Sequence, residues 1–122
     1  MYGDYSVPDG DVAAALIRAI HFGYWDEVQA LVPVLPDVNA RDGNGDWTPL
    51  MYAVHEESFD TVKLLVEAGA DVNLRGSFET EEDFALNLAA YAGNKEIFNY
   101  LAPLTLLELR AIAERTLSQR NR

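Results

Sequence analysis

Apolar residues recur at helical spacing along most of this 122-residue chain. Two stripes follow each other in the middle of the chain: Leu50, Ala53 and Val54, and then Phe59, Val62, Leu65 and Val66. Residues three and four positions apart share one face of a helix, so each stripe indicates an amphipathic helix. The full pattern predicts helices over residues 11–22, 25–34, 49–56, 59–68, 84–92, 95–101 and 105–117.

The pattern repeats along the chain, and the repeat is visible in residue identities. When residues 16–39 are aligned with residues 50–73, at an offset of 34, ten of the 24 pairs are identical. The pairs are Leu16/Leu50, Ala19/Ala53, His21/His55, Asp26/Asp60, Val28/Val62, Leu31/Leu65, Val32/Val66, Asp37/Asp71, Val38/Val72 and Asn39/Asn73. A third copy follows at an offset of 36, with Leu86 and Ala89 in the places of Leu50 and Ala53. Such a period predicts a stack of helix pairs, because one pair cannot bury its own apolar face.

Several residues are suited to the expected helix ends. Thr48 can cap a helix N-terminus, and Pro49 fits the first helical position, where no donor is needed. Gly69 fits the left-handed residue just after a helix, and Asp11 is the expected cap of the first helix. Three small residues, Ala19, Ala53 and Ala89, allow helices to pack closely.

The middle copy carries a resemblance to a known family. The segment from Trp47 to Ala53, W-T-P-L-M-Y-A, resembles the ankyrin motif T-P-L-H-x-A, and the segment from Leu64 to Asn73 resembles the ankyrin ending L-L-x-x-G-A-D-V-N. The resemblance covers residues 11–102. It implies an all-α ankyrin-repeat solenoid of stacked antiparallel helix pairs with projecting loops, in one domain over residues 1–122. The repeats would span residues 11–40, 41–74 and 75–104, followed by a capping helix over residues 105–117.

The chain departs from the family pattern at a few places. Pro36 replaces the glycine turn at the end of the first copy, and proline precludes a continued helix. Glu57 occupies the place of Gly23 and Gly93, so we expect a turn that is strained or built differently. The loops before Leu50 and Leu86 are longer than the family norm, and the second contains Phe78, a candidate contact residue.

The charge is strongly negative and unevenly distributed. Nine basic and twenty acidic residues give a net charge of −11, with −13 in residues 1–100 and +2 in residues 101–122. An acidic body repels phosphate backbones, so we expect no nucleic-acid partner, whereas a partner with a basic surface would be attracted. The chain has no cysteine, no apolar run long enough to span a membrane and no signal peptide at Met1–Tyr5, which fits a cytoplasmic, monomeric protein.

Residues 42–46 begin like a calcium loop, but Trp47 and Ala53 stand where an EF-hand needs glycine and glutamate. The histidines His21 and His55 occupy equivalent repeat positions, which explains the pair without a metal. None of the serines lies in a G-x-S-x-G elbow, and no phosphate-binding glycine loop is present. We therefore expect neither a catalytic site nor a cofactor.

The resemblance also implies a binding face. Ankyrin proteins usually meet partners on the concave face, at positions just before T-P-L and just before the glycine between the helices. Carried over to this chain, these positions are His21, Phe22, Trp47, His55, Glu56, Asp83, Tyr91 and Ala92. Exposed aromatics with an acidic rim are typical of interface hot spots.

The leading hypothesis is therefore a non-catalytic protein-interaction module with an acidic, aromatic-containing concave face. One alternative is an inhibitor, or an immunity or antitoxin protein, that blocks a basic toxin or a nucleic-acid-binding enzyme. Another is a structural repeat that forms oligomers. The sequence leaves these alternatives open.

Overall fold

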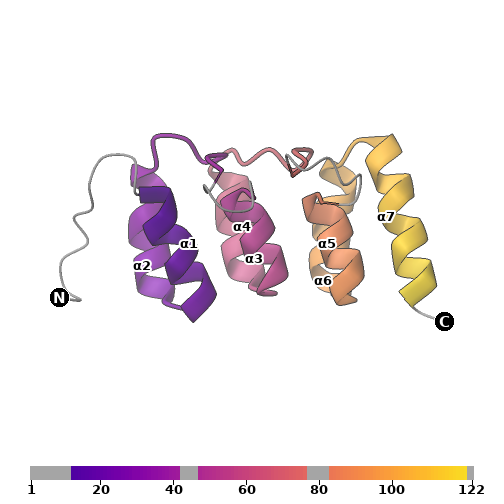
Figure 1. Ribbon diagram of the computed structural model, residues 1–122, viewed down its shortest axis with the longest axis horizontal. Coiled ribbons are helices and arrows are strands. Elements are labelled where there is room, and N and C mark those ends of the chain that lie inside the picture. The colour runs from indigo at the N-terminus through magenta and orange to yellow at the C-terminus, as the bar shows by residue number, and fades with distance from the viewer. Residues whose placement is uncertain (1–11, 42–46, 77–82, 121–122) are drawn as a thin grey trace.

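The computed structural model describes residues 12–41, 47–76 and 83–120 (Figure 1). In these three ranges the chain forms seven α-helices. They are α1 (Val12–Phe22), α2 (Trp25–Leu31), α3 (Pro49–His55), α4 (Phe59–Glu67), α5 (Ala85–Ala92), α6 (Lys95–Leu101) and α7 (Leu107–Arg120). The predicted Asp11 cap, the segment 42–46 and Phe78 lie outside the described residues.

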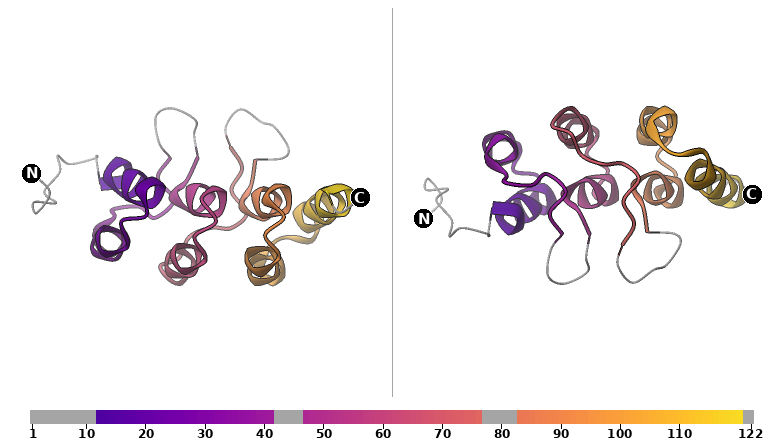
Figure 2. Two further views of the ribbon diagram at one scale, coloured as in Figure 1. Left: turned by 90° about the horizontal axis from the view of Figure 1, so that it is seen from below. Right: turned by 90° about the horizontal axis from the view of Figure 1, so that it is seen from above.

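The helices form two rows. Figure 2 shows α1, α3, α5 and α7 side by side in an inner row, while α2, α4 and α6 form an outer row. Each of α1, α3 and α5 packs against the outer helix that follows it and against the next helix of the inner row. The described chain is therefore an all-α repeat solenoid of three helix pairs, and α7 continues the inner row against α5, as a capping helix should.

The core runs through the whole stack along the predicted stripes. Leu16, Leu50 and Leu86 hold the same repeat position and are at most 1% exposed. The three alanines of the inner helices, Ala19, Ala53 and Ala89, are fully buried. A residue larger than alanine there would force neighbouring helices apart, so the small side chain sets the spacing of the inner row.

Two helix starts confirm or extend the sequence interpretation. Thr48 Oγ1 accepts a hydrogen bond from Met51 N at 3.3 Å, and Pro49 is the first residue of α3. Asn94 Oδ1 accepts from Ile97 N at 3.0 Å at the start of α6. Ser58, which precedes α4, makes no such bond. Gly69 has φ 99°, the left-handed value expected after α4.

The turn at Glu57 follows the same path as the glycine turns of the other repeats. Glu57 has φ 57°, close to the values of 73° for Gly23 and 69° for Gly93. The turn is therefore built in the same way, but with a non-glycine residue in the left-handed region. There the Cβ atom comes too close to the following carbonyl oxygen, so the backbone conformation is strained. The Glu57 carboxylate Oε1 accepts a hydrogen bond from Asn94 Nδ2 at 3.2 Å in the next repeat.

The predicted boundaries are wrong in two segments. The helix expected over residues 25–34 is α-helical only to Leu31 and then tightens to a 3₁₀ turn, Val32–Val34, because proline at position 33 cannot donate. The helix expected over residues 105–117 begins at Leu107 and ends at Arg120. Thr105 is extended, with its hydroxyl donating to Leu101 O, and Leu106 is exposed.

Asparagine side chains join successive repeats on the loop side. Asn39 Oδ1 accepts from Asp71 N at 2.8 Å, and Asn73 Oδ1 accepts from Leu106 N at 2.9 Å. Each asparagine is held in turn by its own backbone N–H, which donates to the carboxylate of Asp37 or Asp71 at 2.9 Å. The same pair of bonds therefore links the first repeat to the second and the second to the segment before α7.

Candidate functional site

The first group of candidate residues lies where α1 and α3 end. His21 Nδ1 lies 2.9 Å from Glu56 Oε2, and since a carboxylate only accepts, the ring N–H donates. The Phe22 ring meets His21 edge-on at 4.8 Å and stacks on Tyr24 at 5.6 Å. The Phe22 side chain is nonetheless 58% exposed. His21, Phe22 and Glu56 are thus brought together from two repeats, with a large aromatic surface open to solvent.

The second group lies at the start of α3. The Trp47 indole Nε1 donates to Asp83 Oδ2 at 3.2 Å, so two residues predicted as separate contacts are bonded to each other. The Trp47 ring also meets Tyr52 at 5.2 Å and His55 at 5.5 Å, both edge-on. Trp47 and Asp83 are half-buried by these contacts. Their positions are therefore fixed within the chain before any partner arrives.

A groove on the inner row connects the two groups. It has a volume of about 440 Å³ and is lined by residues of α1 and α3, together with Glu56. The lining residues are Ala14, Ile17, Arg18, His21, Phe22, Tyr52, His55 and Glu56. His55 and Tyr52 touch Trp47, so the ring cluster at the start of α3 borders one side of this groove.

Tyr91 and Ala92 belong to the third repeat. They end α5, and Tyr91 is 49% exposed whereas Ala92 is half-buried. Four of the eight predicted residues line the groove, namely His21, Phe22, His55 and Glu56. Trp47 contacts two of the lining residues, Tyr52 and His55. Tyr91 and Ala92 are not among the lining residues.

Sequence reasoning missed half of the groove. Arg18 and Tyr52 hold the same repeat position, three residues before His21 and His55, and both line it. That spacing is one helical turn, so the face that carries His21 must also carry Arg18. The helical period already present in the sequence was the signal that could have found them.

The charge of the groove differs from that of the chain as a whole. Its lining contains one base, Arg18, and one acid, Glu56, besides the two histidines. The acidic residues Glu81 and Glu82, which the sequence places in the loop before Asp83, lie outside the described residues. Within the described part, the groove is mainly apolar and aromatic.

Within residues 12–41, 47–76 and 83–120, no three histidine, aspartate or glutamate side chains gather as a metal site would require. None of the helices in these ranges is long and apolar enough to cross a membrane.

The paired helices, left-handed turns and asparagine links define a helical repeat protein of the solenoid class. The family model for ankyrin repeats, in three copies, matches residues 4–76. The chain belongs to the ankyrin-repeat family, whose members are generally non-catalytic and bind other proteins.

The chain is similar to parts of larger proteins. It is 37% identical over 65 residues to an ankyrin repeat protein of Rickettsia bellii, a match that spans 53% of this chain and 36% of that protein. It is 32% identical over 96 residues to the ankyrin repeat and KH domain-containing protein mask-1 of Caenorhabditis elegans, spanning 79% of this chain and 4% of that protein. A third relative is the ankyrin repeat and SAM domain-containing protein 6 of Rattus norvegicus, 40% identical over 67 residues, which are 55% of this chain and 8% of that protein. The chain therefore spans about a third of the length of the Rickettsia protein and less than a tenth of the length of the other two relatives.

Proposed function

We propose that this chain is a non-catalytic interaction module that holds a partner protein in the groove between α1 and α3. The observation that carries the proposal is the groove itself, which is mainly apolar and aromatic, has a volume of about 440 Å³ and is built from two repeats. Phe22 at its edge is 58% exposed, and an exposed aromatic beside a pocket is the usual anchor of an interface.

The charge of the chain supports a basic partner. A net charge of −11 attracts a positively charged protein over distances beyond contact and raises its association rate. The groove then supplies apolar contact, and the net negative charge of the chain supplies attraction. We propose that the protein acts as a monomer in the cytoplasm on a basic partner protein, without nucleic acid, membrane or cofactor.

The experiment starts from a partner captured by pull-down from native lysate and measures its binding kinetics. Phe22→Ala should mainly speed dissociation, because it removes buried contact area, and a hot spot would cost about 2 kcal/mol or more. Val34→Ala is the matched control, since Val34 is 61% exposed but lies in the 3₁₀ turn after α2, outside the groove. Equal dissociation rates for the two variants would contradict the proposal.

The role of charge is measured in the same assay. Neutralising Glu81 and Glu82 together should slow association and flatten its dependence on salt, because charges outside the contact mainly steer the encounter. An association rate that does not change would rule out the basic partner. If the partner is an enzyme or a toxin, a fall in its activity on binding would favour the inhibitor alternative.

A further inference from the structure

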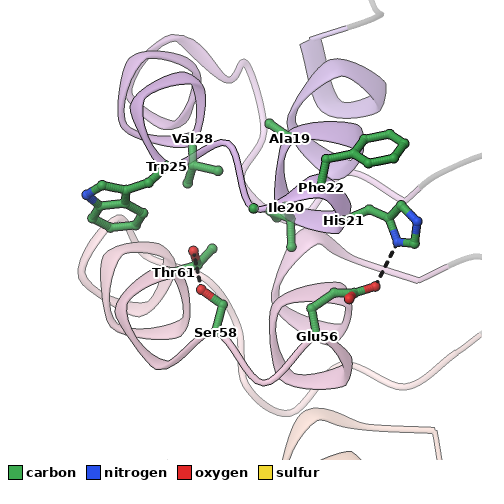
Figure 3. Close-up of a pocket in the computed structure, with 10 residues that line it drawn as sticks. Ala19, Ile20, His21, Phe22, Trp25, Val28, Glu56, Ser58 and Thr61 are labelled. Carbon is green, nitrogen blue, oxygen red and sulfur yellow. Dashed lines mark hydrogen bonds and ion pairs between the residues drawn. The ribbon is translucent and has the colours of Figure 1, made fainter.

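A second cavity lies between the first and second repeats, on the side of the stack where short turns join the two helices of each pair. It has a volume of about 250 Å³. The first repeat contributes the apolar wall, with Ile20, Trp25 and Val28. The second repeat contributes polar groups from Glu56, Ser58 and Thr61. Figure 3 shows Trp25 on one side of this pocket and the His21–Glu56 pair on the other, with Ser58 and Thr61 between them.

The polar residues of the pocket do not make the helix-capping hydrogen bond that a serine before a helix usually makes. Ser58 precedes α4 but does not cap it, and its hydroxyl instead donates to Thr61 Oγ1 at 2.8 Å. Thr61 is only 2% exposed, so a hydroxyl pair lies at the bottom of the pocket. The Glu56 carboxylate accepts one hydrogen bond from His21, whereas a carboxylate can accept about four. Both groups can therefore accept donors from a ligand.

The third repeat carries different residues at these positions. The residues equivalent to Glu56, Ser58 and Thr61 are Ala92, Asn94 and Ile97. Asn94 caps α6, and Ile97 is larger than threonine and fully buried. In the third repeat the three positions thus carry a small apolar residue, a helix cap and a core residue. In the second repeat the same positions carry a carboxylate and two hydroxyls around an open space.

The chemistry of the lining selects the occupant. The ligand must bring an apolar stem to pass along Ile20 and Val28, and a positive group with several donors to meet Glu56 and the hydroxyls. A guanidinium group has five donors, pairs with carboxylates through two bonds and stacks on aromatic rings such as Trp25. We propose that this pocket takes the side chain of an arginine presented by the partner protein. The inference rests on the proposed function and deepens it, because it states how a basic partner is recognised.

The proposal can be tested without the partner. The probe is N-acetyl-arginine amide, titrated into the whole chain while the backbone amides of Ser58 and Thr61 and the Trp25 indole are followed by NMR. We expect saturable shifts at these three groups. N-acetyl-norleucine amide, which has a stem but no charge, should leave them unchanged. An equal response to both probes, or no saturable response to arginine, would overturn the proposal.

Variants test the individual groups. Thr61→Ile introduces the residue of the third repeat and should abolish arginine binding by filling the pocket, while Thr61→Val keeps the volume, removes one hydroxyl and should weaken binding less. Glu56→Gln should weaken arginine binding by about tenfold or more, since hydrogen bonds to charged groups are the strong ones. Glu96→Gln is the control, because it removes a charge from an exposed position at the first turn of α6. Binding to the Thr61→Ile variant at wild-type affinity would disprove the pocket, provided its thermal unfolding shows a folded protein.

Two further results separate this proposal from the proposed function. If N-acetyl-lysine amide binds as tightly as the arginine probe, the selection of a guanidinium group is wrong. If the Thr61→Ile variant binds the captured partner as wild type does, while Phe22→Ala still speeds dissociation, then the groove is the interface and the arginine pocket is disproved.

Discussion

Glu57 occupies a backbone conformation that glycine holds in the other two repeats. A left-handed residue with a Cβ atom costs roughly 1–2 kcal/mol, and Glu57 gains in return one exposed hydrogen bond with Asn94. Exposed bonds of this kind contribute little. The middle turn is therefore a point of local strain in the stack, next to the Glu56 side chain that the binding proposals use.

This strain gives a pair of opposite predictions. Glu57→Gly should stabilise the protein by about 1 kcal/mol, because glycine adopts φ 57° without a steric penalty. Gly23→Ala should destabilise it by a similar amount, about 1 kcal/mol, since the added Cβ atom meets nothing within 4 Å and only the backbone conformation is strained. Urea unfolding of both variants measures the two changes. Changes of the same sign would contradict the account.

Leu65 provides a test of the core. It is fully buried in α4, so Leu65→Ala should lower the free energy of unfolding by about 2–5 kcal/mol through lost burial and a cavity. Val66→Ala, on the same helix but only partly buried, is the control and should cost less. A loss below about 1 kcal/mol for Leu65→Ala would show that this residue does not belong to the core.

The outer helices begin in different ways. Asn94 supplies a side-chain cap to α6, whereas Ser58 directs its hydroxyl to Thr61 and leaves α4 uncapped. Among the inner helices, α3 has both a threonine cap and a proline at its first position. The start of α3 is therefore specified by two side chains, whereas α5 begins after Phe84 without a side-chain cap.

The cap of α3 is testable by substitution. Thr48→Ala should lower the free energy of unfolding by about 1 kcal/mol, because it removes the acceptor for Met51 N at a site that is 2% exposed. Ser58→Ala removes a hydroxyl of the same type that caps nothing, and it should cost less. Denaturant titrations of the two variants compare them directly, and a larger loss for Ser58→Ala would reverse the interpretation.

The helices themselves could be predicted from sequence because each buried stripe has a helical period and the copies agree with one another. The boundary of the last helix failed because a tertiary contact replaced a local one. Leu106 reads as an apolar residue of that helix, but its backbone N–H is held by Asn73 from the second repeat. No pattern within residues 105–117 carries that information.

The candidate site was predictable to the same degree. The groove residues His21 and His55 follow from the repeat, since equivalent positions lie side by side on neighbouring helices. Trp47 and Asp83 are also equivalent repeat positions, at the offset of 36, but the hydrogen bond between their side chains depends on loop conformations that the repeat does not specify. The pocket at Thr61 also depends on the volume left between two repeats, which no single stripe determines.

At the scale of the whole molecule, charge works against stability. A net charge of −11 on 122 residues leaves the folded chain under its own repulsion. Besides the His21–Glu56 contact, the described residues contain an ion pair between Arg110 and Glu114 at 3.5 Å. This pair is exposed and contributes little to the free energy of unfolding. Residues 101–122, with a charge of +2, offset only a small part of this excess.

Salt should therefore stabilise this protein. The screening length falls from about 30 Å at 0.01 M salt to about 8 Å at 0.15 M, so the repulsion between distant carboxylates weakens. The midpoint of urea unfolding should rise when sodium chloride is added over this range. A variant in which Glu67 and Glu96, both exposed, are changed to glutamine should show a smaller rise. A midpoint that falls with salt would mean that attractive pairs dominate.

The asparagine links between repeats have a consequence for how the protein ages. In both links the accepting atom is the side-chain oxygen, Asn39 Oδ1 or Asn73 Oδ1, and the donor is a backbone N–H, that of Asp71 in the second repeat or of Leu106 before α7. Slow hydrolysis of the amide to a carboxylate replaces the nitrogen and keeps an oxygen that accepts at least as strongly. Both links thus tolerate deamidation of their asparagine, as long as the backbone itself is not rearranged.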